Sequence, residues 1–376
     1  MIITIVADVL GQENNGTTIT AKRLIKHLKE RGNTVKVVSP LKTDEEGYYT
    51  LPTRSFGPFN SYVAKNGVEL AKPVDAILYE AIKGSDIVHI MLPFKTGIRA
   101  RKIAKELNIP VTSACHCQAE NVTSHVKLQN VKWVNRFIYH RFYRKFYHDV
   151  PYVHCPSAFI ARTLKENGYD MDLRVISNGV EAGYAKKDVQ KLEVLKDKIT
   201  LLTIGRLSRE KRHDLLIDAI ALSKYKDQIQ LVIAGRGPLE KATIKWGRKL
   251  PNKPIIGFYS QHDLVDIINN ADLYVHPADI EIEAIACLEA ITCGLVPVIS
   301  DSTRSATNSF ALEETNLFKA GDPQSLAEKI DYWIEHPEEK QELSKRYLEY
   351  SKQFEINHCI TLMEQMFKDA IENYEK

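Results

Sequence analysis

Glu281-Ile-Glu-Ala-Ile-Ala-Cys-Leu-Glu289-Ala-Ile-Thr-Cys-Gly-Leu-Val-Pro-Val-Ile-Ser300 decides the fold of the second half of the chain. Two carboxylates flank the start of an otherwise apolar helix, and the strand-like run Val296–Ser300 follows directly. A buried carboxylate is costly unless a partner satisfies it, so the two acids indicate a site for a ligand rich in hydroxyls or amides. The alternative is an exposed Glu281, favoured by the helix dipole, and a solvated Glu289. The spacing by itself does not choose between these interpretations.

Short β-rich runs alternate with amphipathic stretches on both sides of this segment. Strands are expected at Ile2–Val6, Thr34–Val38, Asp86–Ile90, Val111–Cys115 and Val153–Cys155, and again at Ile199–Ile204, Gln230–Ala234, Pro254–Ile256, Leu273–His276 and Val296–Ser300. Repeated βα units predict α/β domains with parallel sheets covered on both faces. We expect two doubly wound, Rossmann-like domains facing a cleft. Their expected bounds are residues 1–185 and 186–350, followed by a C-terminal helix, 351–376, that packs back on the first domain.

Composition limits the classes of function. The chain has 376 residues, of which 44% are hydrophobic and 26% charged, and a net charge of +3, so global charge does not indicate nucleic-acid binding. The six cysteines lie mostly in apolar runs, which favours reduced thiols in a cytoplasmic protein. No basic region precedes the first apolar run, and no run approaches membrane-spanning length, so we expect neither a signal peptide nor a membrane span.

A basic turn follows the strand expected at Ile199–Ile204. In Gly205-Arg206-Leu-Ser-Arg-Glu-Lys211, Arg206 offers a planar fork and Lys211 a point charge, a pairing suited to a diphosphate. The alternative is a solvated basic turn. The glycines of Ala234-Gly235-Arg236-Gly237 also follow a strand, but turns favour glycine in any case.

Two positions in the first half are candidates for the same kind of ligand. In Asn14-Asn15-Gly16, Gly16 would let backbone amides approach a phosphate, although a plain helix start explains it too. The spacing is not the dinucleotide fingerprint, so NAD is not predicted. His116 follows the strand expected at Val111–Cys115 and can hydrogen-bond near neutral pH, whereas a structural role is the alternative.

Taken in order, these motifs resemble the retaining glycosyltransferases of family 4, which are glycogen-synthase-like and have the two-domain GT-B fold. The matching residues are Gly205-Arg206-Leu with Lys211, the turn Asn178-Gly179-Val180, Ala271-Asp-Leu-Tyr-Val-His-Pro277, and Glu281 with Glu289-Ala290, Cys293-Gly294 and Pro297-Val-Ile299. The resemblance covers most of the chain and is strongest in its C-terminal half.

The resemblance implies a role for each matching residue. Arg206 and Lys211 would bind the donor diphosphate and stabilise the leaving group, Glu281 would contact the transferred sugar, and Glu289 would hydrogen-bond the ribose. His116 would lie beside the reacting carbon and complete the catalytic set with Glu281, Arg206 and Lys211.

Two further roles concern the ends of the donor. Gly16 would lie near the distal phosphate, and Phe258 with Tyr259 would stand where the family holds the nucleobase. The implied donor is a nucleotide-sugar, with UDP-sugar preferred, and neither a tightly bound cofactor nor an obligatory metal is expected. Asp170-Met-Asp172 matches a metal-binding pattern but is interpreted as a turn.

Two segments depart from the family pattern. Ile282-Glu283-Ala284 stands where the family usually has Gly-Phe-Gly, and the segment 302–307 replaces the usual Gly-Gly. Glu283 adds a negative charge near a sugar phosphate, so these changes leave the identity of the donor open.

The segment Lys127–His148 contains basic and aromatic residues but no acid. Lys132, Arg136, His140 and Arg144 form one helical stripe, and an aromatic stripe lies roughly opposite. Such a helix suits an anionic membrane surface, whereas a core helix that buries its aromatics is the alternative. Lipid-glucosylating members of the family use a similar region, which implies a lipid acceptor.

We therefore expect a hexosyltransferase that moves a hexose, preferably glucose, to diacylglycerol or a lipid-linked glycan, in the cytoplasm or on the inner face of the cell membrane. The alternatives are a capsule or lipopolysaccharide transferase with a glycan acceptor, a nucleotide-sugar-binding protein without turnover, and a GT-B epimerase.

Overall fold

The structure is a computed structural model that describes residues 1–10, 16–55, 70–124 and 128–374. The chain divides into two compact units: unit 1 comprises Met1–Asn178 and Asn357–Lys376, and unit 2 comprises Gly179–Ile356. Asn14 and Asn15 of the predicted first turn, and Lys127 of the predicted basic helix, lie outside the described residues.

Unit 1 is built on a parallel sheet. Over the described residues it has seven strands in the order β3-β2-β1-β4-β5-β6-β7. The bounds are Ile2–Val6 (β1), Thr34–Ser39 (β2), Tyr48–Thr50 (β3), Ile87–Ile90 (β4), Val111–Ala114 (β5), Tyr152–Cys155 (β6) and Asp172–Val175 (β7). β4 and β5 are buried at every position, as expected for central parallel strands covered on both faces.

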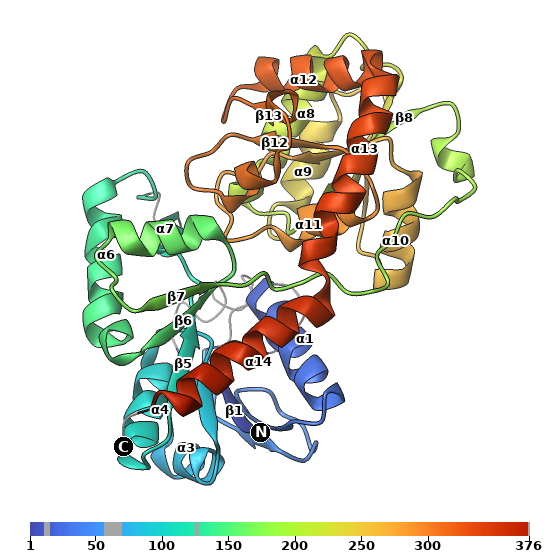
Figure 1. Cartoon of the computed structure of the whole chain (residues 1–376). Helices are drawn as coiled ribbons and strands as arrows, with labels where there is room; N and C mark the ends of the chain where they lie inside the picture. Colours follow the sequence, from blue (N-terminus) through green and yellow to red (C-terminus); the bar gives the residue numbers. More distant parts are fainter. Residues whose placement is uncertain (11–15, 56–69, 125–127, 375–376) are drawn as a thin grey trace. The chain divides into compact units, whose positions relative to one another are not determined.

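Helices connect the strands of this sheet. They are α1 (Gly16–Glu30), α3 (Asp75–Ile82), α4 (Lys95–Glu106), α5 (Ala119–Ser124), α6 (Lys132–Lys145) and α7 (Ala158–Glu166). The last helix of the chain, α14 (Ile356–Glu372), returns to unit 1 and runs along its sheet (Figure 1). The ring of Phe367 on α14 lies 5.3 Å from that of His89 on β4, and Asp369 accepts a 2.8 Å hydrogen bond from Arg174.

Unit 2 repeats the doubly wound plan. Its parallel sheet has six strands over the described residues, in the order β10-β9-β8-β11-β12-β13. The strands are Ile199–Ile204 (β8), Ile229–Ala234 (β9), Ile255–Gly257 (β10), Leu273–His276 (β11), Pro297–Ser300 (β12) and Leu317–Phe318 (β13). The helices are α8 (His213–Leu222), α9 (Glu240–Gly247), α10 (Gln261–Asn270), α11 (Ile285–Thr292), α12 (Pro323–Glu335) and α13 (Pro337–Ser351).

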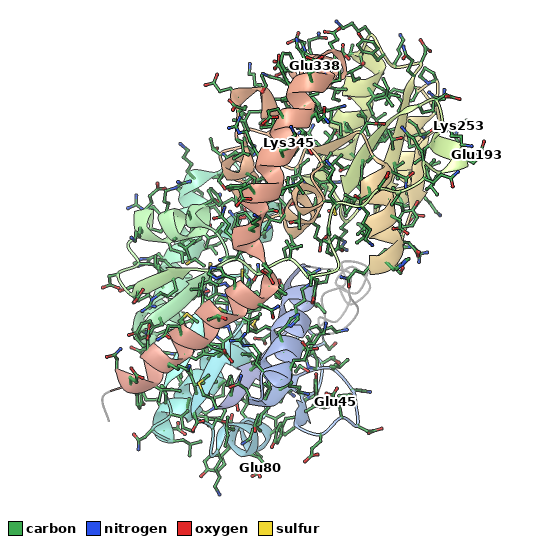
Figure 2. The ribbon with its side chains drawn as sticks, turned by 45° about the vertical axis from the view of Figure 1, so that its right-hand side comes forward. Glu45, Glu80, Glu193, Lys253, Glu338 and Lys345 are labelled. Carbon is green, nitrogen blue, oxygen red and sulfur yellow. The ribbon has the colours of Figure 1, made fainter. Side chains whose placement is uncertain are left out.

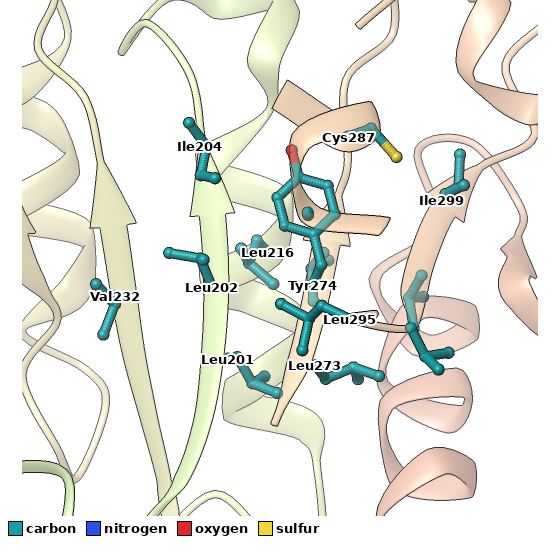
Figure 3. Packing of buried hydrophobic residues seen from close by; sticks show 14 of the residues in the cluster. Leu201, Leu202, Ile204, Leu216, Val232, Leu273, Tyr274, Cys287, Leu295 and Ile299 are labelled. Atoms are coloured by element: carbon teal, nitrogen blue, oxygen red, sulfur yellow. The ribbon is translucent and has the colours of Figure 1, made fainter. Parts of the chain in front are cut away.

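The core of unit 2 lies between its sheet and its helices. Leu202 of β8, Tyr274 of β11, Leu216 of α8 and Cys287 of α11 are all fully buried and belong to one apolar cluster (Figure 3). Each large aliphatic side chain buried in this way contributes roughly 1.5–3 kcal/mol. Charged side chains such as Lys253 extend from the outside of the ribbon instead (Figure 2).

The predicted fold class is confirmed: both units are doubly wound α/β domains with parallel sheets. The sequence did not predict β3, β7, β13 or α13. The strands β3 and β13 are only three and two residues long, and the ends of β7 are exposed, so none has a readable hydrophobic pattern. In α13 most positions are polar, and Leu343 and Tyr347 are its only buried apolar residues among those the structure describes.

Candidate active site

The carboxyl ends of β8 and β11 lie at the topological switch point of the unit 2 sheet. The two strands are neighbours, and the strand order runs away from them in opposite directions. Ligands of open α/β sheets bind at such a point. Gly205 and Arg206 follow β8, Lys211 ends the same turn, and Glu281 follows β11. The fold therefore brings together residues that are about 70 positions apart in the sequence.

A chain of side-chain contacts connects Lys211 to the buried sheet. The Nζ of Lys211 forms an ion pair with the carboxylate of Glu281. The Nε2 of His276 lies 3.1 Å from the same carboxylate, and its Nδ1 lies 2.9 Å from the hydroxyl of Tyr274. Because a carboxylate can only accept, Nε2 donates to Glu281 and the neutral ring accepts from Tyr274 at Nδ1. The carboxylate is thus held in one orientation from the core side.

Glu281 is ionised at neutral pH. Burial by itself would raise the pKa of this carboxyl, but the positive charge of Lys211 and the hydrogen bond from His276 hold the pKa at about 2. The side chain of Glu281 keeps 13% of its surface exposed, and Glu289 on α11 is only 5% exposed. Neither acid is the solvated residue of the alternative interpretation.

Arg206 is partly buried in the turn after β8. Burial lowers the pKa of its guanidinium, although the nearby negative charge of Glu210 acts to raise it. The turn after β9 packs directly on this segment. A Cβ on Gly235 would lie 1.9 Å from the carbonyl oxygen of Gly205, and a Cβ on Gly237 would lie 2.5 Å from that of Leu207. These glycines are therefore required by the packing of the two turns, and they fix the backbone on which Arg206 stands.

Phe258 lies just beyond β10. Its ring is 59% exposed, although it is apolar, and the guanidinium of Arg236 lies 5.5 Å from the ring centroid. An exposed aromatic face beside a cation is a platform on which a planar group can stack. Arg236 follows β9, the neighbour of β8, so the platform stands on the same edge of the sheet as Arg206.

Gly16 and His116 belong to unit 1. Gly16 begins α1, and a Cβ on it would meet no other described residue within 4 Å. His116 follows β5 and is 7% exposed. Burial lowers the pKa of its imidazole well below the ordinary value, and the nearby His154 and His89 act in the same direction. His116 is therefore neutral at pH 7 and can both donate and accept a hydrogen bond.

Asp172 of the sequence motif Asp170-Met-Asp172 begins β7 and is paired with Arg174 at 2.9 Å, while Asp170 accepts from the hydroxyl of Tyr143. In the part of the chain that the structure describes, no group of three or more His, Cys, Asp and Glu side chains is arranged to hold a metal ion.

Known families match both halves of the chain. Residues 14–183 match Glycosyltransferase Family 4, and residues 185–353 match Glycosyl transferases group 1. The chain is a GT-B glycosyltransferase.

Two relatives illustrate the similarity in sequence. The alpha-monoglucosyldiacylglycerol synthase of Streptococcus pneumoniae is 25% identical over 80% of this chain and 71% of its own length. The GDP-mannose-dependent alpha-(1-6)-phosphatidylinositol dimannoside mannosyltransferase of Mycobacterium tuberculosis is 33% identical over 37% of this chain and 36% of its own. Both names describe glycosyl transfer to a lipid.

Solved structures match the fold over almost the whole chain. The sucrose-phosphate synthase of Thermosynechococcus elongatus has a TM-score of 0.77 at 17% identity, with 99% of both chains covered. Anabaena HepE, solved with UDP and glucose, has a TM-score of 0.74 at 15% identity, with 98% of this chain and 100% of HepE covered.

The departure of this glycosyltransferase from the family pattern has a visible backbone consequence. Ala284 stands at the start of α11 with φ 63° and ψ 61°, a left-handed conformation that glycine adopts more readily. Arg212 adopts the same region, with φ 52°, directly after Lys211. The turns around Glu281 thus keep a glycine-like shape with larger residues in place. Glu283 is buried, 3% exposed, so it does not project into solvent.

No role for His276, Tyr274 or Asp279 was predicted from the sequence. His276 orients Glu281, while Asp279 accepts from Arg212 at 3.3 Å and lies 3.9 Å from Arg304. The signal for His276 was present, because it ends an apolar strand immediately before the segment that leads to Glu281. A histidine at such a position is easily taken for a structural residue.

The helix α6 exposes an aromatic and basic face. Trp133 is 75% exposed and Phe137 63%, and they lie one helical turn apart. The stripe predicted opposite the basic residues faces inward: Phe146 is buried, and Val134, Ile138 and Phe142 are partly buried. Trp133 and Phe137 lie outside that stripe and face outward. The exposed basic residues are Lys132, Arg136, His140, Arg141, Arg144 and Lys145. Among the described residues, no helix combines the length and the apolar character needed to cross a membrane.

Proposed function

We propose that this glycosyltransferase moves a hexose, glucose, from a UDP-sugar to a membrane lipid such as diacylglycerol, with retention of configuration at the anomeric carbon. The observation that carries the proposal is the partly buried Lys211–Glu281 pair, held by His276, at the switch point beside Arg206. A cation pair suits a diphosphate, and a fixed carboxylate suits the hydroxyls of a sugar.

The donor diphosphate would be bound by Arg206 and Lys211. As the sugar–phosphate bond breaks, negative charge develops on the departing oxygen, and preorganised cations stabilise it. In front-face attack the acceptor oxygen forms its bond to the anomeric carbon on the side from which the diphosphate leaves. The proton of the acceptor hydroxyl passes to the leaving phosphate oxygen. Glu281 would hold the transferred sugar in place throughout.

The remaining contacts would position the ends of the donor and the reacting carbon. Glu289 would bind the ribose, Phe258 would stack on the base, and the backbone of Gly16 would approach the distal phosphate. His116 is proposed to hydrogen-bond the transferred sugar as a neutral imidazole. Two relatives have names that specify GDP-mannose, so the base and the sugar must be decided by a panel of donors.

The acceptor is proposed to be a lipid at an anionic membrane surface. Exposed Trp133 and Phe137 suit the interfacial region of a bilayer, and the surrounding Lys and Arg side chains suit anionic headgroups. Phe137 also lines a hollow of about 320 Å³ with His140, Arg141 and Arg144, a setting for a phosphate headgroup. The lipid acceptors named for the two relatives support the same choice.

The test is transfer of labelled sugar into the organic phase. Purified protein is incubated with UDP-glucose, UDP-galactose or GDP-mannose and with vesicles that contain dioleoylglycerol, with or without phosphatidylglycerol. We expect incorporation from UDP-glucose, stimulated by phosphatidylglycerol, and its loss in Lys211→Met and Glu281→Gln. Incorporation that is unaffected by both substitutions would refute the site, and none from any donor would refute the lipid acceptor.

A further inference from the structure

Three buried histidines lie close together in unit 1. His89 is on β4, His116 follows β5, and His154 is on β6, so they come from adjacent strands. The ring centroids of His116 and His154 are 5.3 Å apart with the planes at 80°, and those of His89 and His154 are 6.5 Å apart. Their exposed fractions are 0%, 7% and 3% in sequence order. Groups buried this deeply need hydrogen-bond partners.

The protonation of His154 follows from its contacts. Its Nε2 lies 2.7 Å from the carbonyl oxygen of Ile176. A carbonyl only accepts, so this nitrogen carries the hydrogen. Burial lowers the pKa of His154 to about 4, so the ring is neutral at pH 7 and its Nδ1 is an acceptor. This Nδ1 is buried, and among the described residues it has no hydrogen-bond partner.

His116 also has a buried ring nitrogen that needs a hydrogen-bond partner. Its Nε2 is buried and also has no hydrogen-bond partner within the described ranges. Both His116 and His154 line one small cavity of about 10 Å³, together with Thr20 of α1 and residues of α14. A cavity of this size accommodates one water molecule when polar atoms face it.

We propose that a single buried water in this cavity accepts a hydrogen bond from Nε2–H of His116 and donates one to Nδ1 of His154, which makes His154 the positioning residue of His116. This inference rests on the proposed role of His116 at the transferred sugar. With its hydrogen on Nε2, His116 presents a bare Nδ1, which accepts a hydrogen bond from a sugar hydroxyl. His154 would thereby set both the tautomer and the orientation of the ring.

Two substitutions of His154 separate the proposal from a merely structural role. In His154→Asn the amide oxygen takes the place of the Nδ1 acceptor, and the donor to Ile176 is lost. In His154→Gln the amide nitrogen takes the place of the Nε2 donor, and the Nδ1 acceptor is lost. The proposal predicts that His154→Asn keeps kcat within about 3-fold of wild type. It predicts that His154→Gln lowers kcat by roughly 10- to 100-fold, with a smaller change in KM for UDP-glucose.

A purely structural role predicts the reverse order, since only the bond to Ile176 would then matter. That order, or equal activity of both variants, would overturn the proposal. His89 provides the matched control: it is equally buried and contacts the ring of His154, but it does not line the cavity. Relative to wild type, kcat should change by the same factor in His89→Asn as in His89→Gln, whatever the two substitutions do to stability.

The tautomer gives a second readout that does not need turnover. In full-length protein with ¹⁵N-labelled histidine, long-range ¹H–¹⁵N spectra should show the hydrogen of His116 on Nε2, and a shift towards Nδ1 in His154→Gln. A hydrogen on Nδ1 in wild type would overturn the water link. If His116→Ala retains full transfer while the spectra show the Nε2 tautomer, the proposed role of His116 in transfer is wrong but the water link stands.

Discussion

Lys211→Met tests the ion pair at the switch point through stability, without any ligand. Glu281 has a pKa of about 2 in the folded state and an ordinary value of 4.5. At about 1.4 kcal/mol for each pKa unit, this difference means that the charged form of Glu281 stabilises the folded state by roughly 3 kcal/mol. Because the folded pKa is depressed, the contribution is complete above about pH 4.5 and is lost as the pH falls towards 2.

Removal of Lys211 leaves Glu281 buried without its strongest partner. We therefore expect the free energy of unfolding of unit 2 to fall by about 3 kcal/mol at neutral pH. The double variant Lys211→Met/Glu281→Gln should recover part of this loss, because the uncompensated charge is gone. Lys249→Met is the matched control, since its pair with Asp218 is 44% and 48% exposed and should contribute less than about 1 kcal/mol.

Tryptophan fluorescence during urea unfolding measures this loss in the correct unit. Two of the three tryptophans, Trp246 and Trp333, lie in unit 2, and a Trp133→Phe background removes the signal of the third. A midpoint for Lys211→Met no lower than that of Lys249→Met would refute the reasoning. So would a double variant that is less stable than Lys211→Met.

Three further outcomes follow from other parts of the structure. Burial raises the pKa of Asp8 from 3.8 to about 6 despite hydrogen bonds from Thr96 and Gly97, so its charged form destabilises the fold by roughly 3 kcal/mol above pH 6 and by nothing below pH 3.8. Asp8→Asn should therefore raise Tm at pH 7.5 but not at about pH 4. An equal change in Tm at both pH values would contradict this. Ala284→Gly should leave the free energy of unfolding unchanged or raise it by up to about 1 kcal/mol, because relief of the left-handed strain offsets the entropy of glycine. Ala290→Gly within α11 should lower the free energy of unfolding by about 1 kcal/mol. Equal losses for the two variants in chemical denaturation would argue against strain at Ala284. Trp133→Ser/Phe137→Ser should lower sedimentation with phosphatidylglycerol vesicles at least 10-fold while leaving Tm within about 2 °C, and undiminished sedimentation would exclude this face of α6.

The sequence predicted those features that depend on periodicity and on local motifs. The buried parallel strands β8, β9, β11 and β12 are mostly apolar, and the turn with Arg206 and Lys211 follows the first of them. The strand order was not predictable from these runs. It is the order that makes β8 and β11 neighbours and so brings Lys211 to Glu281.

What the sequence could not supply were contacts between distant side chains. No pattern shows that His276 donates to Glu281, or that Gly235 is required because its Cβ would strike the carbonyl oxygen of Gly205. The exposure of Phe137 on α6 was also hidden, because Phe146, just after the helix, is the same residue type but is buried, and the two differ only in what packs against them.

The configuration of the product tests the central claim most directly. Wild-type protein is incubated with UDP-α-glucose and diacylglycerol vesicles, and the anomeric proton of the isolated glycolipid is assigned by NMR. A retaining enzyme that uses the Arg206, Lys211 and Glu281 site predicts an α-glucosyl lipid, and Lys211→Met should yield none. A β-glucosyl product, or a glucolipid formed equally well by Lys211→Met, would contradict the account.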